Sequence, residues 1–274
     1  MTSRHQLEIL SARLSDRDWR IMRLLKRYRY ATTRQLSIAV FDGSPEQRAI
    51  PRHVNHALAR LRDLGLLPNL ERRVGGVRAG SAGHVWALSD LAHKALANRS
   101  GDTPGARVRA FEPSPTFLEH TLAVTETAIQ LERGGHARQL EPEPECWRTY
   151  LNATGMAVRL KPDLAAVTTD GDFEDHWFFE IDRATEPPSR IIRKSLQYQT
   201  YRSTGIEQRN VGVFPGVVWI APNETRRDQL RRHLDADGRI EPTLFAVIVP
   251  AELDDLVASG FSNYPGGQKG GNPS

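Results

Sequence analysis

The chain has 274 residues, of which 39% are hydrophobic and 26% charged, and a net charge of +4. This length suits two domains of ordinary size, and no apolar run approaches the roughly 18 residues of a membrane span. A single cysteine, Cys146, excludes an internal disulfide, and the first residues lack the apolar core of a signal peptide. We therefore expect a cytoplasmic protein with no membrane partner.

The first hundred residues predict a helical unit with two short strands. Ser15 is a typical helix cap before acidic residues, and Gly65 is placed to end a helix at its C-terminus. Apolar spacing predicts helices over about 16–28, 33–40, 46–65 and 89–97, and strands over 66–74 and 84–88. A Gly-rich loop joins the two strands.

The third predicted helix and the strand loop carry polar and basic side chains that could reach DNA. These are Arg48, Arg52, Asn55, His56 and Arg60 on the helix, and Arg72, Arg73 and Arg78 on the loop. With the run Leu58-Ala-Arg-Leu-Arg-Asp-Leu-Gly-Leu66, residues 14–97 resemble a winged helix-turn-helix domain. The resemblance implies a recognition helix in the major groove and phosphate contacts from the wing. The alternative is a protein-interaction module whose arginines are simply solvated.

Residues 98–115 are rich in Gly, Ser, Thr, Arg and Pro, which is typical of a linker. A second domain is predicted over 116–258, with a turn at 170–172 and a disordered tail over 259–274. Its predicted helices cover about 116–133, 189–204 and 224–234, and its strands cover 136–140, 157–160, 164–167, 177–181, 217–220 and 244–249.

Three carboxylates lie beside the apolar runs of this second domain. Asp163 begins one predicted strand, and Glu180 and Asp182 lie two residues apart on the next, so both should point to the same face. Such a set could hold Mg²⁺, which binds one or two carboxylates and activates water for phosphodiester attack. The alternative is structural: Glu180 and Asp182 could pair with arginines, for which the neighbours Arg183, Arg190 and Arg193 are candidates.

The order helix, three strands, helix, strand resembles the PD-(D/E)XK nuclease core, a three-layer α/β restriction-endonuclease-like fold. The matching residues are Pro162-Asp163, Glu180-Ile-Asp182 and the pair Gln197 and Tyr201. The resemblance implies catalytic roles for these residues. Asp182 occupies the position of the family's lysine, so we expect either that Lys194 replaces that lysine or that cleavage is lost.

Most of the chain resembles the replication-relaxation family. The residues that carry this resemblance are Phe117-Leu-Glu-His120, Pro162-Asp163, Phe179-Glu-Ile-Asp182 with Thr185-Glu186, and Lys194, Tyr198 and Tyr201. It implies a protein of plasmids or conjugative elements that acts on double-stranded DNA in replication or mobilisation.

Two further interpretations stay open at this level. One is a non-enzymatic transcriptional regulator or relaxase accessory factor, dimeric on a palindromic site. The other is covalent attack on DNA by Tyr198 or Tyr201.

Overall fold

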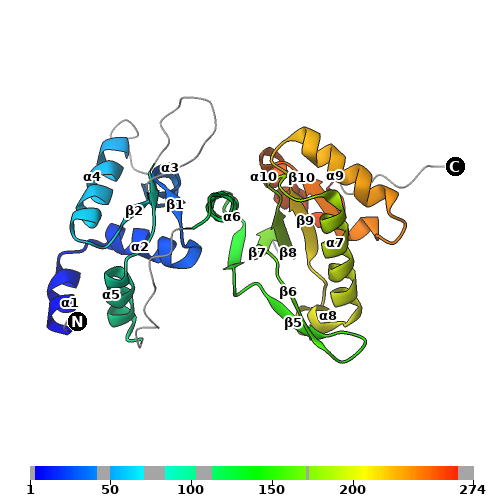
Figure 1. Cartoon of the computed structure of the whole chain (residues 1–274), viewed down its shortest axis with the longest axis horizontal. Coiled ribbons are helices and arrows are strands. Elements are labelled where there is room, and N and C mark those ends of the chain that lie inside the picture. Colours follow the sequence, from blue (N-terminus) through cyan, green and yellow to red (C-terminus); the bar gives the residue numbers. More distant parts are fainter. Residues whose placement is uncertain (1–3, 42–49, 71–83, 103–112, 171–172, 265–274) are drawn as a thin grey trace. The chain divides into compact units, whose positions relative to one another are not determined.

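The computed structural model describes residues 4–41, 50–70, 84–102, 113–170 and 173–264. They fall into two compact units, Met1–Ile129 and Gln130–Ser274. Helices and sheets occur in both units, which confirms the predicted mixed α/β class (Figure 1). Within the described ranges, every helix is either too short or too polar to serve as a membrane span.

The N-terminal unit packs helices around a small antiparallel sheet. Its helices are α1 (Arg4–Ala12), α2 (Asp16–Tyr28), α3 (Thr33–Leu36), α4 (Ile50–Asp63) and α5 (Asp90–Ser100), with a π-helical turn at Ser37–Phe41. Its strands are β1 (Ala31–Thr32), β2 (Asn69–Leu70) and β3 (Val85–Trp86), in the order β1-β3-β2. The buried core includes Trp19, Ile21, Leu36, Leu58, Leu61 and Trp86.

Asp18 takes part in the capping box of α2 and also joins that helix to α4. Its carboxylate accepts a hydrogen bond from the Ser15 backbone N–H at 2.7 Å, and the Ser15 hydroxyl accepts one from the Asp18 N–H at 3.3 Å. This reciprocal pair is a capping box, which satisfies N–H groups that the first helical turn leaves without partners. The same carboxylate, only 1% exposed, forms an ion pair with Arg60. Arg60 therefore holds two helices together.

The C-terminal unit is built on a five-stranded mixed sheet in the order β10-β9-β8-β7-β4. Its strands are β4 (Ala137–Pro142), β7 (Leu164–Asp170), β8 (Phe173–Ile181), β9 (Gly216–Ile220) and β10 (Phe245–Ile248). β4, β7 and β8 pair antiparallel, whereas β8, β9 and β10 run parallel. Parallel neighbours need crossover connections, which contain α7 (Pro188–Ser203), α8 (Ile206–Val211) and α9 (Glu224–Ala236).

Different elements cover the two faces of this sheet. α7 and α9 lie together on one face (Figure 1). The core between these helices and the sheet includes Phe178, Tyr198, Val217, Leu230 and Phe245. Side chains alternate along a strand, so Trp177, the neighbour of Phe178 on β8, points to the face of the sheet opposite α7 and α9. There its ring contacts Phe261 in the turn Phe261–Asn263, which follows α10 (Leu253–Ser259).

Two sequence predictions of boundaries differ from this architecture. Residues 259–264, predicted as the start of a disordered tail, form the end of α10 and the turn that packs on Trp177. The chain divides within α6 (Pro115–Arg133) instead of in the predicted linker, part of which lies outside the described residues. The first part of α6 belongs to the N-terminal unit, where the Thr125 hydroxyl donates to the Tyr30 carbonyl at 3.0 Å. Such contacts between residues far apart in the sequence cannot be predicted from local composition.

A separate hairpin extends the C-terminal unit. It consists of β5 (Arg148–Leu151) and β6 (Ala157–Leu160), which pair only with each other among the described strands. The sequence predicted β6 but not β5. The turn predicted at 170–172 falls mainly on residues 171–172, which lie outside the described residues.

The link between α2 and α4 can be tested with Arg60→Ala. We expect the free energy of unfolding to fall by about 1–2 kcal/mol, because the buried Asp18 carboxylate loses its cation. Arg62→Ala is the matched control on the same helix: its ion pair with Asp63 is exposed, so a change below about 0.5 kcal/mol is expected. Urea unfolding of both variants measures the difference, and equal losses would contradict a structural role for Arg60.

Candidate functional site

The candidate site is a cluster around Glu180, a carboxylate buried on β8. Glu180 is 1% exposed, and the Tyr198 hydroxyl donates to its Oε1 at 2.5 Å. The Nζ of Lys194 donates to the other oxygen, Oε2, and forms an ion pair with it. Asp163 is close enough for its negative charge to act on both Glu180 and Lys194. The structure thus gathers three of the predicted catalytic residues.

The backbone explains why these side chains meet. Asp163 directly precedes β7 and is held against β8, because its carboxylate accepts a hydrogen bond from the Ile181 N–H at 2.7 Å. Lys194 and Tyr198 are four residues apart on α7, so they lie on one side of that helix. α7 covers the face of the sheet to which Glu180 points.

Burial controls the ionisation of this cluster. It raises the pKa of Glu180 from 4.5 to about 8, although the Lys194 cation acts in the opposite direction. Burial also lowers the pKa of Lys194, but the charges of Glu180 and Asp163 outweigh this effect and the net change is upward. Burial raises the pKa of Tyr198 far above its ordinary value, and Glu180 adds to this. Glu180 is therefore much easier to protonate than an exposed glutamate, whereas Lys194 keeps its positive charge.

Asp182, the third predicted metal ligand, is held by an arginine of α9. The Arg226 guanidinium donates to Oδ2 at 2.6 Å and to Oδ1 at 3.3 Å, and the side chains are 9% and 1% exposed. Arg226 also donates to the Glu186 carbonyl at 2.7 Å. Glu180 and Asp182 do point to the same face, as expected, but they bind different helices. Arg226, the arginine that pairs with Asp182, is distant in sequence and is not among the neighbours proposed from sequence. One of those neighbours, Arg190, pairs with Glu186 instead.

The three predicted carboxylates do not form one metal-binding group. Among the described residues, no three His, Cys, Asp or Glu side chains lie close enough together to hold a metal ion. Asp163 and Glu180 are neighbours, whereas both oxygens of Asp182 bind Arg226. Magnesium binding stays a prediction, but not through the three-carboxylate arrangement that the spacing indicated.

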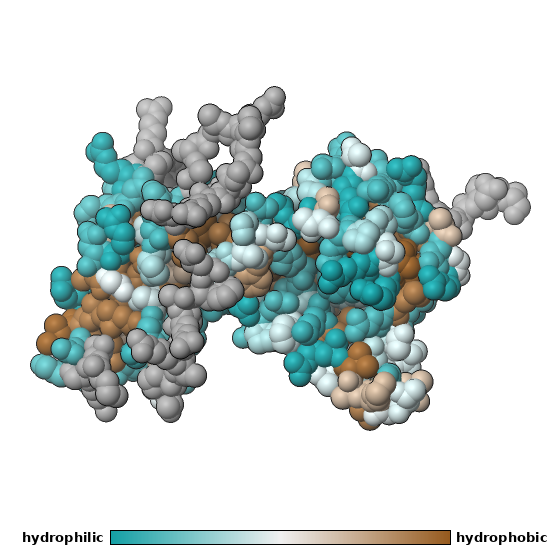
Figure 2. All heavy atoms as spheres, in the orientation of Figure 1, coloured by the Kyte–Doolittle hydropathy of each residue, from teal (hydrophilic) through white to brown (hydrophobic). Residues whose placement is uncertain are grey.

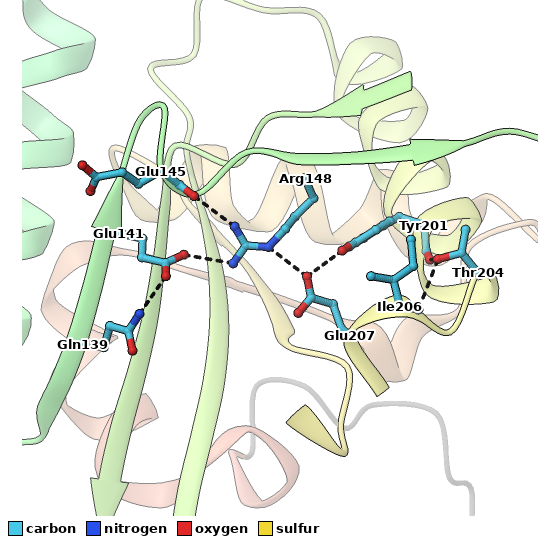
Figure 3. A network of polar contacts seen from close by, with 8 residues as sticks. All are labelled: Gln139, Glu141, Glu145, Arg148, Tyr201, Thr204, Ile206 and Glu207. Atoms are coloured by element: carbon cyan, nitrogen blue, oxygen red, sulfur yellow. Dashed lines mark hydrogen bonds and ion pairs between the residues drawn. The ribbon is translucent and has the colours of Figure 1, made fainter. Parts of the chain in front are cut away.

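A second polar network lies where β5 meets α7 and α8, and Figure 3 shows it. The Arg148 guanidinium donates to Glu207 at 2.9 Å and to Glu141 at 3.0 Å. The hydroxyl of Tyr201, a predicted catalytic residue, donates to the same Glu207 oxygen at 2.6 Å. The network is a structural link between the hairpin and α7, and sequence reasoning missed Arg148, Glu141 and Glu207.

The geometry does not favour covalent attack by a tyrosine. Tyr198 and Tyr201 are 0% and 1% exposed, and both hydroxyls donate to carboxylates. Burial raises the pKa of both phenols, so neither is prepared to act as a nucleophile at neutral pH. Gln197 is tied to the hairpin, because its amide donates to the Arg159 carbonyl at 3.2 Å. The Nζ of Lys161, which is next but one before Asp163, lies over the Trp147 ring at 4.5 Å from its centre.

The predicted DNA contacts of the N-terminal unit divide into three groups. Arg52, Asn55 and His56 are exposed on α4. Arg60 lies on the same helix but pairs with Asp18. The others lie outside the described residues: Arg48, Arg72, Arg73 and Arg78.

A family model described as replication-relaxation matches residues 22–217. The chain belongs to the replication-relaxation family. The matched part of this replication-relaxation protein includes Asp163, Glu180 and Lys194 but ends before Arg226. No curated protein and no solved structure matches the chain.

The buried pair of Asp182 and Arg226 predicts a large effect of Asp182→Asn. The variant leaves a buried guanidinium without its anion, which should lower the free energy of unfolding by about 3–5 kcal/mol. Asp228→Asn is the control on α9, because Asp228 pairs with Arg227 at the surface and its loss should leave the unfolding midpoint nearly unchanged. Urea or thermal unfolding compares the two, and a stable Asp182→Asn protein would show that the pair is dispensable.

The raised pKa of Glu180 predicts a dependence of stability on pH. The unfolded chain releases this proton near pH 4.5 and the folded protein only near pH 8, so the folded state binds more protons between them. Its contribution to stability is complete below the lower value and is lost as pH rises through the higher one. Unfolding free energies of wild type and Glu180→Gln, measured from about pH 5 to 8, should therefore diverge, with wild type losing more. A difference independent of pH would contradict the raised pKa.

Proposed function

We propose that this protein binds double-stranded DNA through its N-terminal unit and acts, without cleaving it, as an accessory factor in replication or mobilisation. In this proposal the C-terminal unit is a nuclease-like core that has lost phosphodiester cleavage. The DNA belongs to a plasmid or conjugative element, and the partners are a relaxase or another mobilisation protein. A palindromic site would require a homodimer.

This proposal rests on the hydrogen bonds that already engage both carboxylate oxygens of Glu180. Lys194 and Tyr198 already use both of its oxygens, and Arg226 uses both oxygens of Asp182. A cation at Glu180 would have to displace the Lys194 ammonium and repel it at close range. The side chains as arranged therefore do not fit Mg²⁺.

The element order supports the nuclease-like assignment of the C-terminal unit. The sequence α6, β4, β7, β8, α7, β9 repeats the helix, three strands, helix, strand order of that fold, with β5 and β6 inserted as a hairpin. β8 and β9 are parallel and linked through α7 on one face, in agreement with a layered α/β core. Asp163, Glu180 and Lys194 then occupy neighbouring positions, as expected of a relative of such nucleases.

The DNA-binding part of the proposal rests on α4. This helix is preceded by the short α3, leads into β2, and exposes Arg52, Asn55 and His56, which suits a recognition helix in a major groove. Asn and Arg are side chains that read base edges or bind phosphates. The small antiparallel sheet β1-β3-β2 is the counterpart of the wing.

An Mg²⁺-dependent endonuclease is the second candidate. It is favoured by one observation, the approach of Lys194 to Glu180 beside Asp163, which matches a nuclease lysine moved to the following helix. In that case Asp163 and Glu180 would be the residues that hold the ion, and the ion would supply the means to activate a water molecule. Lys194 would then have to leave Glu180.

The DNA-binding prediction concerns Arg52→Ala. Loss of one phosphate contact should weaken binding to duplex DNA and reduce the slope of log K against log salt by about one. Arg23→Ala removes an exposed arginine from α2 and serves as the charge-matched control, with no effect on the slope. Fluorescence anisotropy over a salt series measures both. Absence of any salt-dependent binding by wild type would sink the proposal.

The cleavage test uses wild type and Asp163→Ala with supercoiled and linear DNA in Mg²⁺ or Mn²⁺. We expect both proteins to bind the DNA and to leave it intact, because Lys194 keeps a cation away from Glu180. Nicking by wild type that is lost in Asp163→Ala would overturn the accessory role in favour of the endonuclease.

A further inference from the structure

The hairpin of β5 and β6 presents one face to the core and one to solvent. In its register Thr149 lies opposite Arg159, and Leu151 lies opposite Ala157. These four residues are exposed, whereas Tyr150, on the other face, is buried in the core. The turn that joins the strands lies at the lower end of the C-terminal unit in Figure 1.

The tip of this hairpin is apolar. Leu151 and Met156 are 65% and 63% exposed, the highest values for large apolar side chains among the described residues. Figure 2 shows pale to brown atoms at this end of the unit, beside the largely hydrophilic surface above it. Single exposed apolar residues are ordinary, but two on one projecting turn, with Ala153 and Ala157 exposed beside them, form a patch.

The base of the hairpin is held firmly. Arg148 joins β5 to Glu207 of α8 and to Glu141 at the end of β4 (Figure 3). The ring of Tyr150 lies 5.3 Å from that of Tyr201 on α7, measured between centroids. These contacts fix where the tip points, so that its apolar side chains are presented before any partner binds.

The charge of the hairpin indicates the kind of partner. Residues 146–162 contain two arginines and one lysine and no acidic residue. Arg159 is exposed on the same face as Leu151 and Thr149, and Lys161 is exposed just beyond β6. The tip is thus apolar and the cationic side chains of Arg159 and Lys161 lie toward the base of the hairpin. This arrangement is complementary to a duplex, in which anionic phosphates border apolar base steps.

We propose that the β5–β6 tip is a DNA wedge, in which Leu151 and Met156 press between base pairs while Arg159 and Lys161 contact the flanking phosphates. The inference rests on the proposed DNA binding and deepens it by assigning the C-terminal unit a contact of its own. Apolar wedges unstack a base step and kink the duplex, so the predicted consequence is local opening of DNA. Such opening suits a factor that prepares DNA for processing by another protein.

The test compares Leu151→Ser/Met156→Ser with Val211→Ser/Val213→Ser in the full chain. The control pair is also exposed and apolar, at 44% and 48%, but lies outside the hairpin. The probe is a duplex of about 30 base pairs with 2-aminopurine at a central TA step, which is easily unstacked, and a fluorophore pair at its ends. Anisotropy reports binding, 2-aminopurine reports unstacking, and energy transfer reports bending.

Wild type and the control pair should unstack and bend the probe. The hairpin variant should lose both signals, keep the salt dependence, and bind roughly tenfold more weakly, since apolar side chains no longer leave water. Salt-dependent binding by wild type without unstacking, or unstacking retained by the hairpin variant, would overturn the wedge alone. Absence of salt-dependent binding by wild type would overturn the proposed function as well. If the variant changed only the sedimentation coefficient, the tip would instead be a contact between two copies of this chain.

Discussion

Much of the C-terminal unit is arranged around the buried carboxylate of Glu180. A carboxyl group at 1% exposure needs partners for both oxygens, and both come from α7. The hydrogen bond from Tyr198 and the ion pair with Lys194 therefore fix the position of α7 along β8. Because α7 also carries Tyr201 and Gln197, the same position sets their contacts with Glu207 and with the hairpin.

A second buried pair reinforces this arrangement at the end of β8. Asp182 takes both hydrogen bonds from Arg226, which ties the end of that strand to α9. Each pair is unfavourable to break, because the remaining charge would stay buried without a counterion. Together they explain how the cluster that we propose to be nuclease-derived can serve as part of the framework of the C-terminal unit. A site that cleaves must leave carboxylate oxygens open to a cation, and here those of Glu180 and Asp182 are bound by the chain's own cations.

The sequence predicts those helices and strands whose apolar spacing and capping residues lie within the element itself. The apolar spacing and the Ser15 cap located α2, and the apolar runs located β8, β9 and β10. α1, α8 and α10 were missed, since short helices stabilised by packing carry weak periodicity. β5 was missed because the residues before it are rich in proline and acids.

For the candidate site, spacing placed Glu180 and Asp182 on one face and singled out Lys194. It could not find Arg226, which is 44 residues from Asp182 and is brought there only by the crossover through α9. Nor could composition show that Glu180 is almost fully buried, which decides its pKa and its chemistry. Burial depends on how the layers pack, and one sequence records this only indirectly.

Binding of Mn²⁺ to the wild-type protein, measured by titration calorimetry with Glu180→Gln as reference, tests the central claim most directly. If Lys194 and Tyr198 keep both oxygens of Glu180 bound and so unavailable to a cation, wild type and Glu180→Gln will show the same weak, unsaturable heats. One saturable Mn²⁺ site per chain in wild type that disappears in Glu180→Gln would contradict the account, because the carboxylate would then be a metal ligand.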